Sequence, residues 1–239
     1  MEPLITILKK FFPQVGKNTY AQYGEDVLLD GLCHTLGIDT PHYIDIGTHH
    51  ASNLSNTYLF YKQGSSGVCI EPSPDLARAI AKARPRDIVR AVGVGASSST
   101  APLPYYVLTA QTMNTFSKAD AKQTIAAPDV YGPQQIEHIE HIPVIGINDI
   151  LNEYALYMDI VSIDTEGMDE EIVRAIDFKK YRPKIWCIET VTQAPDNSFN
   201  KNRSLISYLK EQGYVVYADT YVNTIFVDKK LWKYGSTII

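Results

Sequence analysis

The sequence predicts an α/β fold with a mainly parallel central sheet. Apolar runs at residues 42–47 and 67–71 are separated by enough chain for one crossover helix, which makes them parallel neighbours. Each run carries an acid near its end, Asp45 in the first and Glu71 in the second. Within residues 214–227, by contrast, two apolar runs are joined by a link too short for a crossover, so these strands can pair only antiparallel.

The other elements are expected to alternate along the chain. Leucines at helical spacing predict a helix over residues 20–37 that ends at Gly37. The crossover helix can begin at Asn53 or Ser55, both good caps, and ends near Gly64. After the second strand we expect a helix starting at Ser73-Pro74 with Leu76, Ile80 and Ala83 inward, a strand at 87–93, a helix at 145–154, a strand at 158–163, a helix at 169–177, a strand at 184–188 and a helix at 204–212.

Residues 96–141 interrupt this alternation. The segment is rich in Ser, Thr, Ala, Gln and Pro, and we expect one strand in it, at 105–108. A long loop-rich segment inside a compact domain is usually functional. We therefore expect a single domain over residues 1–239 with an insertion that forms a substrate cover. Its aromatic and amide side chains could pack against sugar rings or simply pack the cover; they are Tyr105, Tyr106, Asn114, Phe116 and Tyr131.

Composition excludes several functional classes. The chain has 239 residues, of which 45% are hydrophobic and 21% charged, which suits one globular domain. A formal net charge of −5 argues against a general affinity for nucleic acid or for an anionic membrane. The three cysteines, Cys33, Cys69 and Cys187, are widely spaced in apolar runs, so we expect reduced core residues of a cytoplasmic protein.

The N-terminal residues carry the pattern of an amphipathic helix and not that of a targeting or membrane segment. No run in the sequence is long and apolar enough to cross a bilayer, and the N-terminus does not read as a signal peptide. Residues 1–19 are expected to form a helical extension with an apolar stripe, which would pack on the domain or on a second copy in a homo-oligomer. The stripe consists of Leu4, Ile5, Leu8, Phe11 and Phe12.

The two acids predict the kind of site. Carboxyl ends of parallel strands meet at one edge of a sheet, and open α/β sheets bind nucleotides and nucleosides there. Glu71, after the second strand, is well placed to accept hydrogen bonds from both ribose hydroxyls of such a ligand. Its structural alternative, capping the next helix, is already met by Ser73. The sequence therefore predicts an enzyme that uses a nucleoside cofactor.

A set of short motifs in fixed order narrows this prediction. They are Ala21-Gln22-Tyr23-Gly24-Glu25-Asp26, Asp45-Ile46-Gly47-Thr48-His49-His50, Ser55-Asn56-Thr57, Ile70-Glu71-Pro72, Asn114-Thr115-Phe116, Ile163-Asp164-Thr165-Glu166-Gly167-Met168-Asp169 and Asn223-Thr224-Ile225-Phe226-Val227. Together they resemble the FkbM-type methyltransferases, over about residues 20 to 228. The resemblance implies a Rossmann-like class I methyltransferase fold, with a mainly parallel seven-stranded sheet, a C-terminal antiparallel hairpin and helices on both faces.

The resemblance also implies an activity. FkbM-type enzymes use S-adenosyl-L-methionine (SAM) for O-methyl transfer, often to sugars of surface polysaccharides or to secondary metabolites. The His-His and Ser-Asn-Thr motifs of this chain are most similar to those of members from polysaccharide biosynthesis. We therefore expect a methyl group to pass from SAM to a hydroxyl of a sugar or glycan precursor.

For the cofactor, the resemblance suggests residues beyond Glu71. Asp45 would receive the methionine ammonium, directly or through water, and Gly47 would admit the methionine moiety; a plain strand-end turn is the structural alternative. A helix start at Ser55, Asn56 and Thr57 would suit the methionine carboxylate, although helix capping explains these three residues equally well.

Two further cofactor contacts are expected from the start of the chain. Gln22 and Tyr23 belong to the first motif and could cover the cofactor from the N-terminal helix. Exposed helix residues would look the same in the sequence.

The expected catalytic residues lie at the ends of the later strands. Asp164 and Glu166 follow the strand at 158–163 and would face the methyl donor, where an acid can orient a hydroxyl or take its proton. Glu166 could instead cap its own helix. His50 or His49 could also serve as general base, because imidazole titrates near neutrality.

A divalent cation is a further possibility. Asp164 and Glu189 end neighbouring strands and could together hold Mg²⁺, which would lower the pKa of the acceptor hydroxyl. His138 and His141 have a His-x-x-His spacing, but no further ligands stand near them, so a solvated face is favoured.

Two competing functions remain to be weighed. A nicotinamide-dependent oxidoreductase is disfavoured because no Gly-x-Gly-x-x-Gly follows the first strand. A SAM-binding module without turnover has one observation in its favour, which is Ala51 in the glycine turn. Both His49 and Ala51 stand where SAM sites often carry glycine. Histidine tolerates unusual backbone angles better than most residues, so the turn remains feasible.

Overall fold

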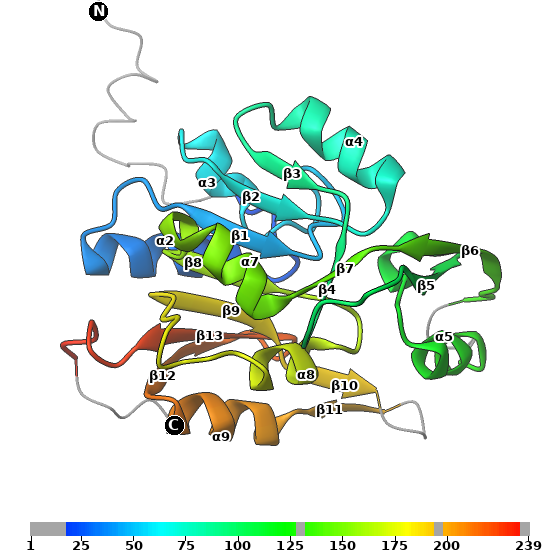
Figure 1. Cartoon of the computed structure of the whole chain (residues 1–239). Coiled ribbons are helices and arrows are strands. Elements are labelled where there is room, and N and C mark those ends of the chain that lie inside the picture. Colours follow the sequence, from blue (N-terminus) through cyan, green and yellow to red (C-terminus); the bar gives the residue numbers. More distant parts are fainter. Residues whose placement is uncertain (1–17, 128–131, 194–197, 235–239) are drawn as a thin grey trace, which may run out of the picture.

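The computed structural model describes residues 18–127, 132–193 and 198–234 (Figure 1). Most of the expected N-terminal extension, with its apolar stripe, and Tyr131 lie outside the described residues. No helix within the described ranges combines the length and apolar character needed to cross a membrane. Cys33, Cys69 and Cys187 are buried and free, as expected of reduced core cysteines.

A seven-stranded sheet forms the centre of the molecule. Its strand order is β12-β13-β9-β8-β1-β2-β3. The pairs β8–β9, β1–β8, β1–β2 and β2–β3 are parallel, and β13 alone runs antiparallel to both of its neighbours. The strands are β1 (Tyr43–Ile46), β2 (Gly67–Ile70), β3 (Ile88–Arg90), β8 (Ile160–Ile163), β9 (Ile185–Glu189), β12 (Tyr214–Asp219) and β13 (Asn223–Asp228). The predicted fold class, including the C-terminal hairpin, is confirmed.

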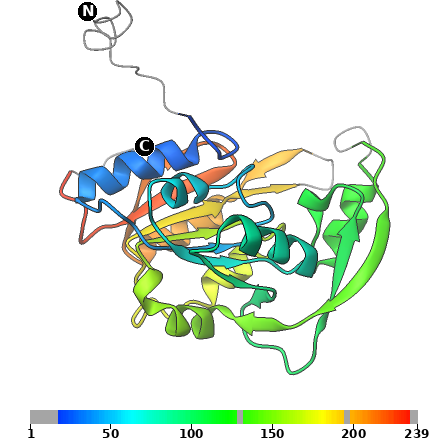
Figure 2. The ribbon, with the colours of Figure 1, turned by 90° about the horizontal axis from the view of Figure 1, so that it is seen from above.

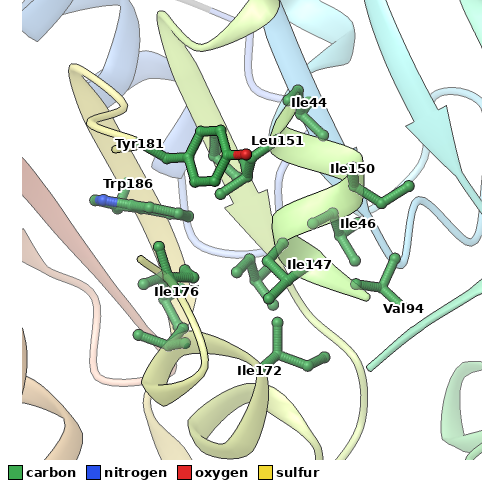
Figure 3. Packing of buried hydrophobic residues seen from close by; sticks show 14 of the residues in the cluster. Ile44, Ile46, Val94, Ile147, Ile150, Leu151, Ile172, Ile176, Tyr181 and Trp186 are labelled. Atoms are coloured by element: carbon green, nitrogen blue, oxygen red, sulfur yellow. The ribbon is translucent and has the colours of Figure 1, made fainter. Parts of the chain in front are cut away.

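Helices cover both faces of this sheet, because the side chains along each strand point alternately to its two faces and both faces are apolar. Along β1, Ile44 and Ile46 pack into one core with α7, α8 and α9, whereas Tyr43 packs into the other with α2, α3 and α4. Figure 3 shows α7 residues Ile147, Ile150 and Leu151 lying over the β1 isoleucines. The helices are α2 (Glu25–Leu36), α3 (Tyr58–Lys62), α4 (Pro74–Ala83), α7 (Ile147–Glu153), α8 (Asp169–Arg174) and α9 (Arg203–Glu211).

The insertion is more regular than the sequence predicted. Its strands β5 (Leu103–Leu108) and β6 (Ile136–Ile142) pair antiparallel, and between them lie the 3-10 turn η1 (Gln111–Met113) and the helix α5 (Lys118–Ile125). The hairpin's buried residues pack in two small clusters of their own. Figures 1 and 2 show this lobe at one side of the molecule, beside the carboxyl ends of the parallel strands.

The remaining short strands connect the lobe to the domain. The expected strand at 87–93 divides, because β3 stays in the main sheet while β4 (Gly93–Gly95) leaves it and pairs with β7 (Val144–Gly146). The helix expected from residue 145 therefore begins only at Ile147. A second small pair, β10 (Val191–Gln193) and β11 (Phe199–Lys201), follows β9 and is antiparallel.

Candidate active site

A cavity of about 240 Å³ opens at the carboxyl ends of β1, β2 and β8. Its strand-end walls are Ile46 to His49, Ile70 to Pro72 and Asp164 to Glu166, and the insertion adds Tyr105, Gln111 to Asn114 and Phe116. The remaining lining residues are Gln22, Leu54, Val92 and Val94. The sheet edge at which the sequence predicted a binding site therefore carries a cavity, and the insertion forms one of its walls.

Glu71 is the buried acid of this cavity, with 3% of its surface exposed. Its two oxygens each accept one backbone N–H, from His49 and from Ser73, both at 2.8 Å. Burial raises the pKa of Glu71 to about 7, against the lowering effect of these two hydrogen bonds. Each oxygen keeps a second lone pair, so the carboxylate can still accept hydrogen bonds from two ligand hydroxyls.

The turn after β1 depends on positive backbone angles. Gly47 has φ +82°, and a Cβ there would stand 1.7 Å from the carbonyl oxygen of Asp164. Glycine is therefore required by the contact between the ends of β1 and β8, which is a different reason from the predicted approach of a ligand. His49 adopts φ +52°, so histidine takes the left-handed conformation in place of a glycine, as expected.

Asp45 does not line the cavity. Because side chains alternate along a strand, Asp45 points to the opposite face from Ile44 and Ile46, into the layer covered by α2 to α4. There its Oδ2 accepts a hydrogen bond of 2.6 Å from the Thr57 hydroxyl. Direct contact between Asp45 and a ligand is not supported by this geometry, and the parity of the strand explains why.

Arg84, a residue that the sequence analysis missed, explains where the polar residues of segment 51–57 point. It follows α4, is completely buried, and donates hydrogen bonds to the Ala51 carbonyl at 2.5 Å, the Ser55 hydroxyl at 2.7 Å and the Thr57 hydroxyl at 3.0 Å. Its guanidinium also lies 3.7 Å from the buried carboxylate of Asp87. The guanidinium thus ties the segment after the β1 turn to α4.

Ser55, Asn56 and Thr57 belong to this buried network and do not line the cavity. The Ser55 hydroxyl accepts the backbone N–H groups of Thr57 and Tyr58, and Asn56 donates to the Ser162 hydroxyl at 3.1 Å. The N–H groups expected to bind a ligand carboxylate are thus partly used within the protein. The helix that was predicted to begin at Asn53 or Ser55 begins only at Tyr58, as α3.

Four carboxylates gather at the ends of β8 and β9. Burial is the largest cause of a raised pKa at each; repulsion by the other carboxylates adds to it at Asp164, Glu166 and Glu189, whereas hydrogen bonds oppose it at Asp169. The pKa of Asp164 rises to about 7, and those of Glu166, Asp169 and Glu189 also rise. Glu166 lines the cavity. Its φ of +51° is in the left-handed region, which is unusual for glutamate.

The predicted metal pair of Asp164 and Glu189 is not supported. Across the described residues, no group of three or more His, Cys, Asp or Glu side chains is arranged to hold a metal ion. His138 and His141 lie on β6, where odd spacing directs them to opposite faces, and His138 contacts Glu140 at 3.0 Å. The predicted solvated position of these histidines agrees with their exposure.

The remaining predicted residues divide between the cavity and the surface. Gln22 lines the cavity, whereas Tyr23 is 59% exposed and does not. His50 is exposed, and its Nδ1 accepts the backbone N–H groups of Ser52 and Asn53. His49, its neighbour, lines the cavity, and burial lowers its pKa. The general base expected at His50 therefore fits the geometry less well than Asp164 does.

The charge of the cavity wall limits what it can bind. Glu71, Asp164 and Glu166 line it, and the lining residues that the structure describes include no Lys or Arg. Apolar and aromatic groups form the rest, among them Val92, Val94, Tyr105 and Phe116. Such a cavity favours a ligand that combines a flat apolar group, hydroxyls and positive charge.

Comparison with known proteins identifies the family. The Methyltransferase FkbM domain model matches residues 45–216, more than half of the chain. The chain belongs to the FkbM methyltransferase family. This confirms the resemblance that its ordered motifs indicated. No curated protein matches the chain significantly.

Two solved structures resemble this FkbM methyltransferase. One is a TehB-like SAM-dependent methyltransferase from Corynebacterium glutamicum, with 11% identity, a TM-score of 0.39 and coverage of 94% of this chain and 96% of the other. The other is an O-methyltransferase from Bacillus cereus in complex with SAH (S-adenosylhomocysteine), with 12% identity, a TM-score of 0.39 and coverage of 93% and 87%. Likenesses this weak carry no argument about the site.

Proposed function

We propose that this FkbM methyltransferase transfers a methyl group from SAM to a hydroxyl of a sugar or glycan precursor. The observation that carries the proposal is the cavity at the strand ends, whose described wall residues include Glu71, Asp164 and Glu166 and no Lys or Arg. SAM presents a sulfonium and an ammonium as cations, together with a ribose diol and an adenine ring. The residues present therefore fit the cofactor in charge and in hydrogen-bonding capacity.

The cofactor would be held by residues of β1 and β2. Glu71 would accept both ribose hydroxyls while its backbone hydrogen bonds to His49 and Ser73 keep it in place. Asp45, Ser55 and Thr57 would act at a distance, because the hydrogen bonds of Thr57 to Asp45 and of Arg84 to Ser55 and Thr57 hold the segment that follows the β1 turn. Gln22 stands at the cavity wall, where it can close over the ligand.

Asp164 would handle the acceptor oxygen. When bound, SAM would supply an electrophilic methyl group, with S-adenosylhomocysteine as the leaving group. The Asp164 carboxylate takes the proton that the hydroxyl loses, and a pKa of about 7 suits a base that works at neutral pH. Glu166, next to it in the wall, can orient the same hydroxyl by accepting or donating a hydrogen bond. Alignment and proton removal are most of what such a displacement needs.

The choice of a carbohydrate acceptor rests on the motifs and on the insertion. The His-His and Ser-Asn-Thr motifs resemble those of members from polysaccharide biosynthesis. Tyr105 and Phe116 of the insertion line the cavity, and their rings lie 4.7 Å apart, so they offer apolar faces to the C–H face of a sugar. Three free, buried cysteines fit a reducing compartment, so we place the reaction in the cytoplasm.

Transfer of labelled methyl groups tests this proposal. The protein is incubated with SAM labelled in the methyl group and with a panel of methyl glycosides and glycosylated small molecules, and products are hydrolysed and analysed as sugars. We expect label in an alkali-stable O-methyl ether of a sugar, reduced at least about tenfold by Asp164→Asn. Label that enters only an aglycone, a nitrogen or a carboxyl ester would contradict the carbohydrate assignment.

A further inference from the structure

A second cavity, of about 110 Å³, adjoins the first. The two share Met113 and Glu166 as wall residues, so a ligand in the second cavity would lie next to the proposed methyl donor. The described residues of the second cavity come from the insertion, from the turn after β8, and from β9 to β11.

The insertion is fitted closely to the turn that it covers. The Thr115 hydroxyl, which is buried, donates a hydrogen bond of 2.9 Å to the backbone carbonyl of Glu166. A Cβ on Gly167 would stand 2.2 Å from the Asp120 carboxylate, so Asp120 of α5 rests directly on the backbone of this turn. The second cavity is therefore built from two segments that hold each other in place.

The second cavity is strongly acidic. Asp120, Glu166 and Glu189 line it, and its described lining residues include no Lys, Arg or His. Lys201 is the cation that acts on Glu189, but its ammonium already donates to the Asp219 carboxylate at 2.7 Å and to the Tyr221 carbonyl at 2.6 Å. The crowding of negative charge raises the pKa of Glu166 and of Glu189, after burial as the larger cause.

Neutral groups complete the wall. Thr115 and Thr124 contribute hydroxyl groups from the insertion, and Phe199 on β11, 42% exposed, contributes an aromatic ring. Carboxylates that accept hydrogen bonds from several hydroxyls, beside a ring that packs on C–H groups, suit a polyhydroxylated ligand. An anionic ligand would bring like charge into a space of low dielectric.

We propose that the second cavity receives the acceptor, and that its three carboxylates select carbohydrates that carry no anionic group there. Neutral sugars and amino sugars are accepted, whereas uronic acids and sugar phosphates are excluded. This inference rests on the proposed function, because it assigns the acceptor side of the same site. In this proposal Asp120 and Glu189, together with Glu166 of the first cavity, determine the specificity for the acceptor.

Ligand-observed NMR titration of the SAH-loaded protein tests the selection. The probes are methyl glycosides in two matched series, glucose, glucosamine and glucuronic acid, and galactose, galactosamine and galacturonic acid. In at least one series we expect the neutral or amino sugar to bind at least about tenfold more tightly than the acid, with a ratio that falls as salt is added. An acid that binds as well as its neutral partner, or no binding by any member, would overturn the proposal.

Variants identify the source of the selection. Glu189→Gln and, separately, Asp120→Asn should reduce the preference against the acid to about threefold or less, because each removes a carboxyl group whose ionised form repels the acid. Glu171→Gln, an exposed acid on α8 outside both cavities, should leave the ratio unchanged. Selection that survives both cavity variants would also overturn the proposal. The salt dependence is read on the unaltered protein, so the test does not depend on the variants folding.

Failure of the proposed function has a separate signature. Binding of SAH is measured in the same samples, and the sugar titrations are repeated without SAH. A protein that binds no SAH contradicts the methyltransferase reaction, whereas a protein that binds SAH but does not discriminate against the acids contradicts only the selection.

Discussion

Single residues of the β1 turn carry constraints that a sequence motif does not reveal. Gly47 combines φ +82° with a position where a Cβ would lie 1.7 Å from the Asp164 carbonyl oxygen. Gly37, after α2, has a similar φ of +72°, but nothing lies within 4 Å of the place of its Cβ. Replacing Gly37 by alanine therefore costs only the strain of the left-handed backbone, whereas replacing Gly47 costs this strain and a steric clash as well.

We expect Gly47→Ala to lower the free energy of unfolding by about 3 kcal/mol or more, because the ends of β1 and β8 must separate. Gly37→Ala should cost only about 1 kcal/mol, which is the cost of the left-handed conformation alone. Urea denaturation of both variants measures the difference. Equal losses would show that the contact with Asp164 is not tight.

Glu71 makes stability depend on pH. Its pKa rises from 4.5 to about 7 on folding, so the folded protein binds this proton more tightly than the unfolded chain does. The resulting contribution is fully present below about pH 4.5 and is lost as pH rises through about 7. A shift of this size corresponds to about 3 kcal/mol.

Between pH 4.5 and 8, the unaltered protein should therefore lose up to about 3 kcal/mol more stability than Glu71→Gln, whose side chain does not ionise. Asp164 titrates in the same range, but it is present in both proteins, so its contribution cancels in the difference. Chemical denaturation at a series of pH values measures this. Parallel stability curves for the two proteins would contradict the raised pKa of Glu71.

At the scale of elements, the parity of β1 and the face of α4 explain which polar residues reach the cavity. Ile44 and Ile46 face one helix layer, so Asp45 must face the other; the sequence contained this parity, but the prediction placed Asp45 at the edge. Arg84, which directly follows α4, continues the helical spacing of its buried residues Ala77 and Ile80, and this spacing was the signal for Arg84.

We expect Arg84→Leu to destabilise the protein by about 3–5 kcal/mol, because the buried carboxylates of Asp45 and Asp87 would lose their cation. Arg78→Leu on the preceding helix, α4, is the matched control. Arg78 is exposed and pairs with the exposed Asp75, so the change should stay within about 0.5 kcal/mol. Thermal unfolding compares the two, and similar losses would mean that the buried network contributes little.

The insertion shows where local patterns stop being informative. Strand β6 carries isoleucine at 136, 139 and 142, a spacing of three that does not match the alternation of a strand. Its strand structure comes from pairing with β5, about thirty residues earlier along the chain, and from the two small clusters on the two faces of β5. Long-range pairing of this kind has no local signature, so the sequence predicted β5 but not β6.

At the scale of the whole molecule, the main sheet was predictable and the composition of the site was only partly so. The order of strands and helices followed from apolar runs, caps and link lengths, which the chain must satisfy locally. Glu71, Gly47, Asp164 and Glu166 were predicted at the edge and line its cavity, and Gln22, which was predicted to cover the cofactor from the N-terminal helix, lines it too. His49 lines it as well, but most of the other predicted polar residues turned into buried networks or toward the surface, because their direction depends on contacts between distant elements.

The central claim is that the cavity at the strand ends binds SAM through Glu71. Calorimetric titration with SAH tests it most directly, with NAD⁺ as the competing nucleoside ligand and Glu71→Ala and Glu171→Ala as matched variants. We predict SAH binding in the micromolar range that Glu71→Ala weakens at least about tenfold, that Glu171→Ala leaves unchanged and that NAD⁺ does not reproduce. Absence of SAH binding, equal binding by Glu71→Ala, or a comparable signal with NAD⁺ would contradict the account.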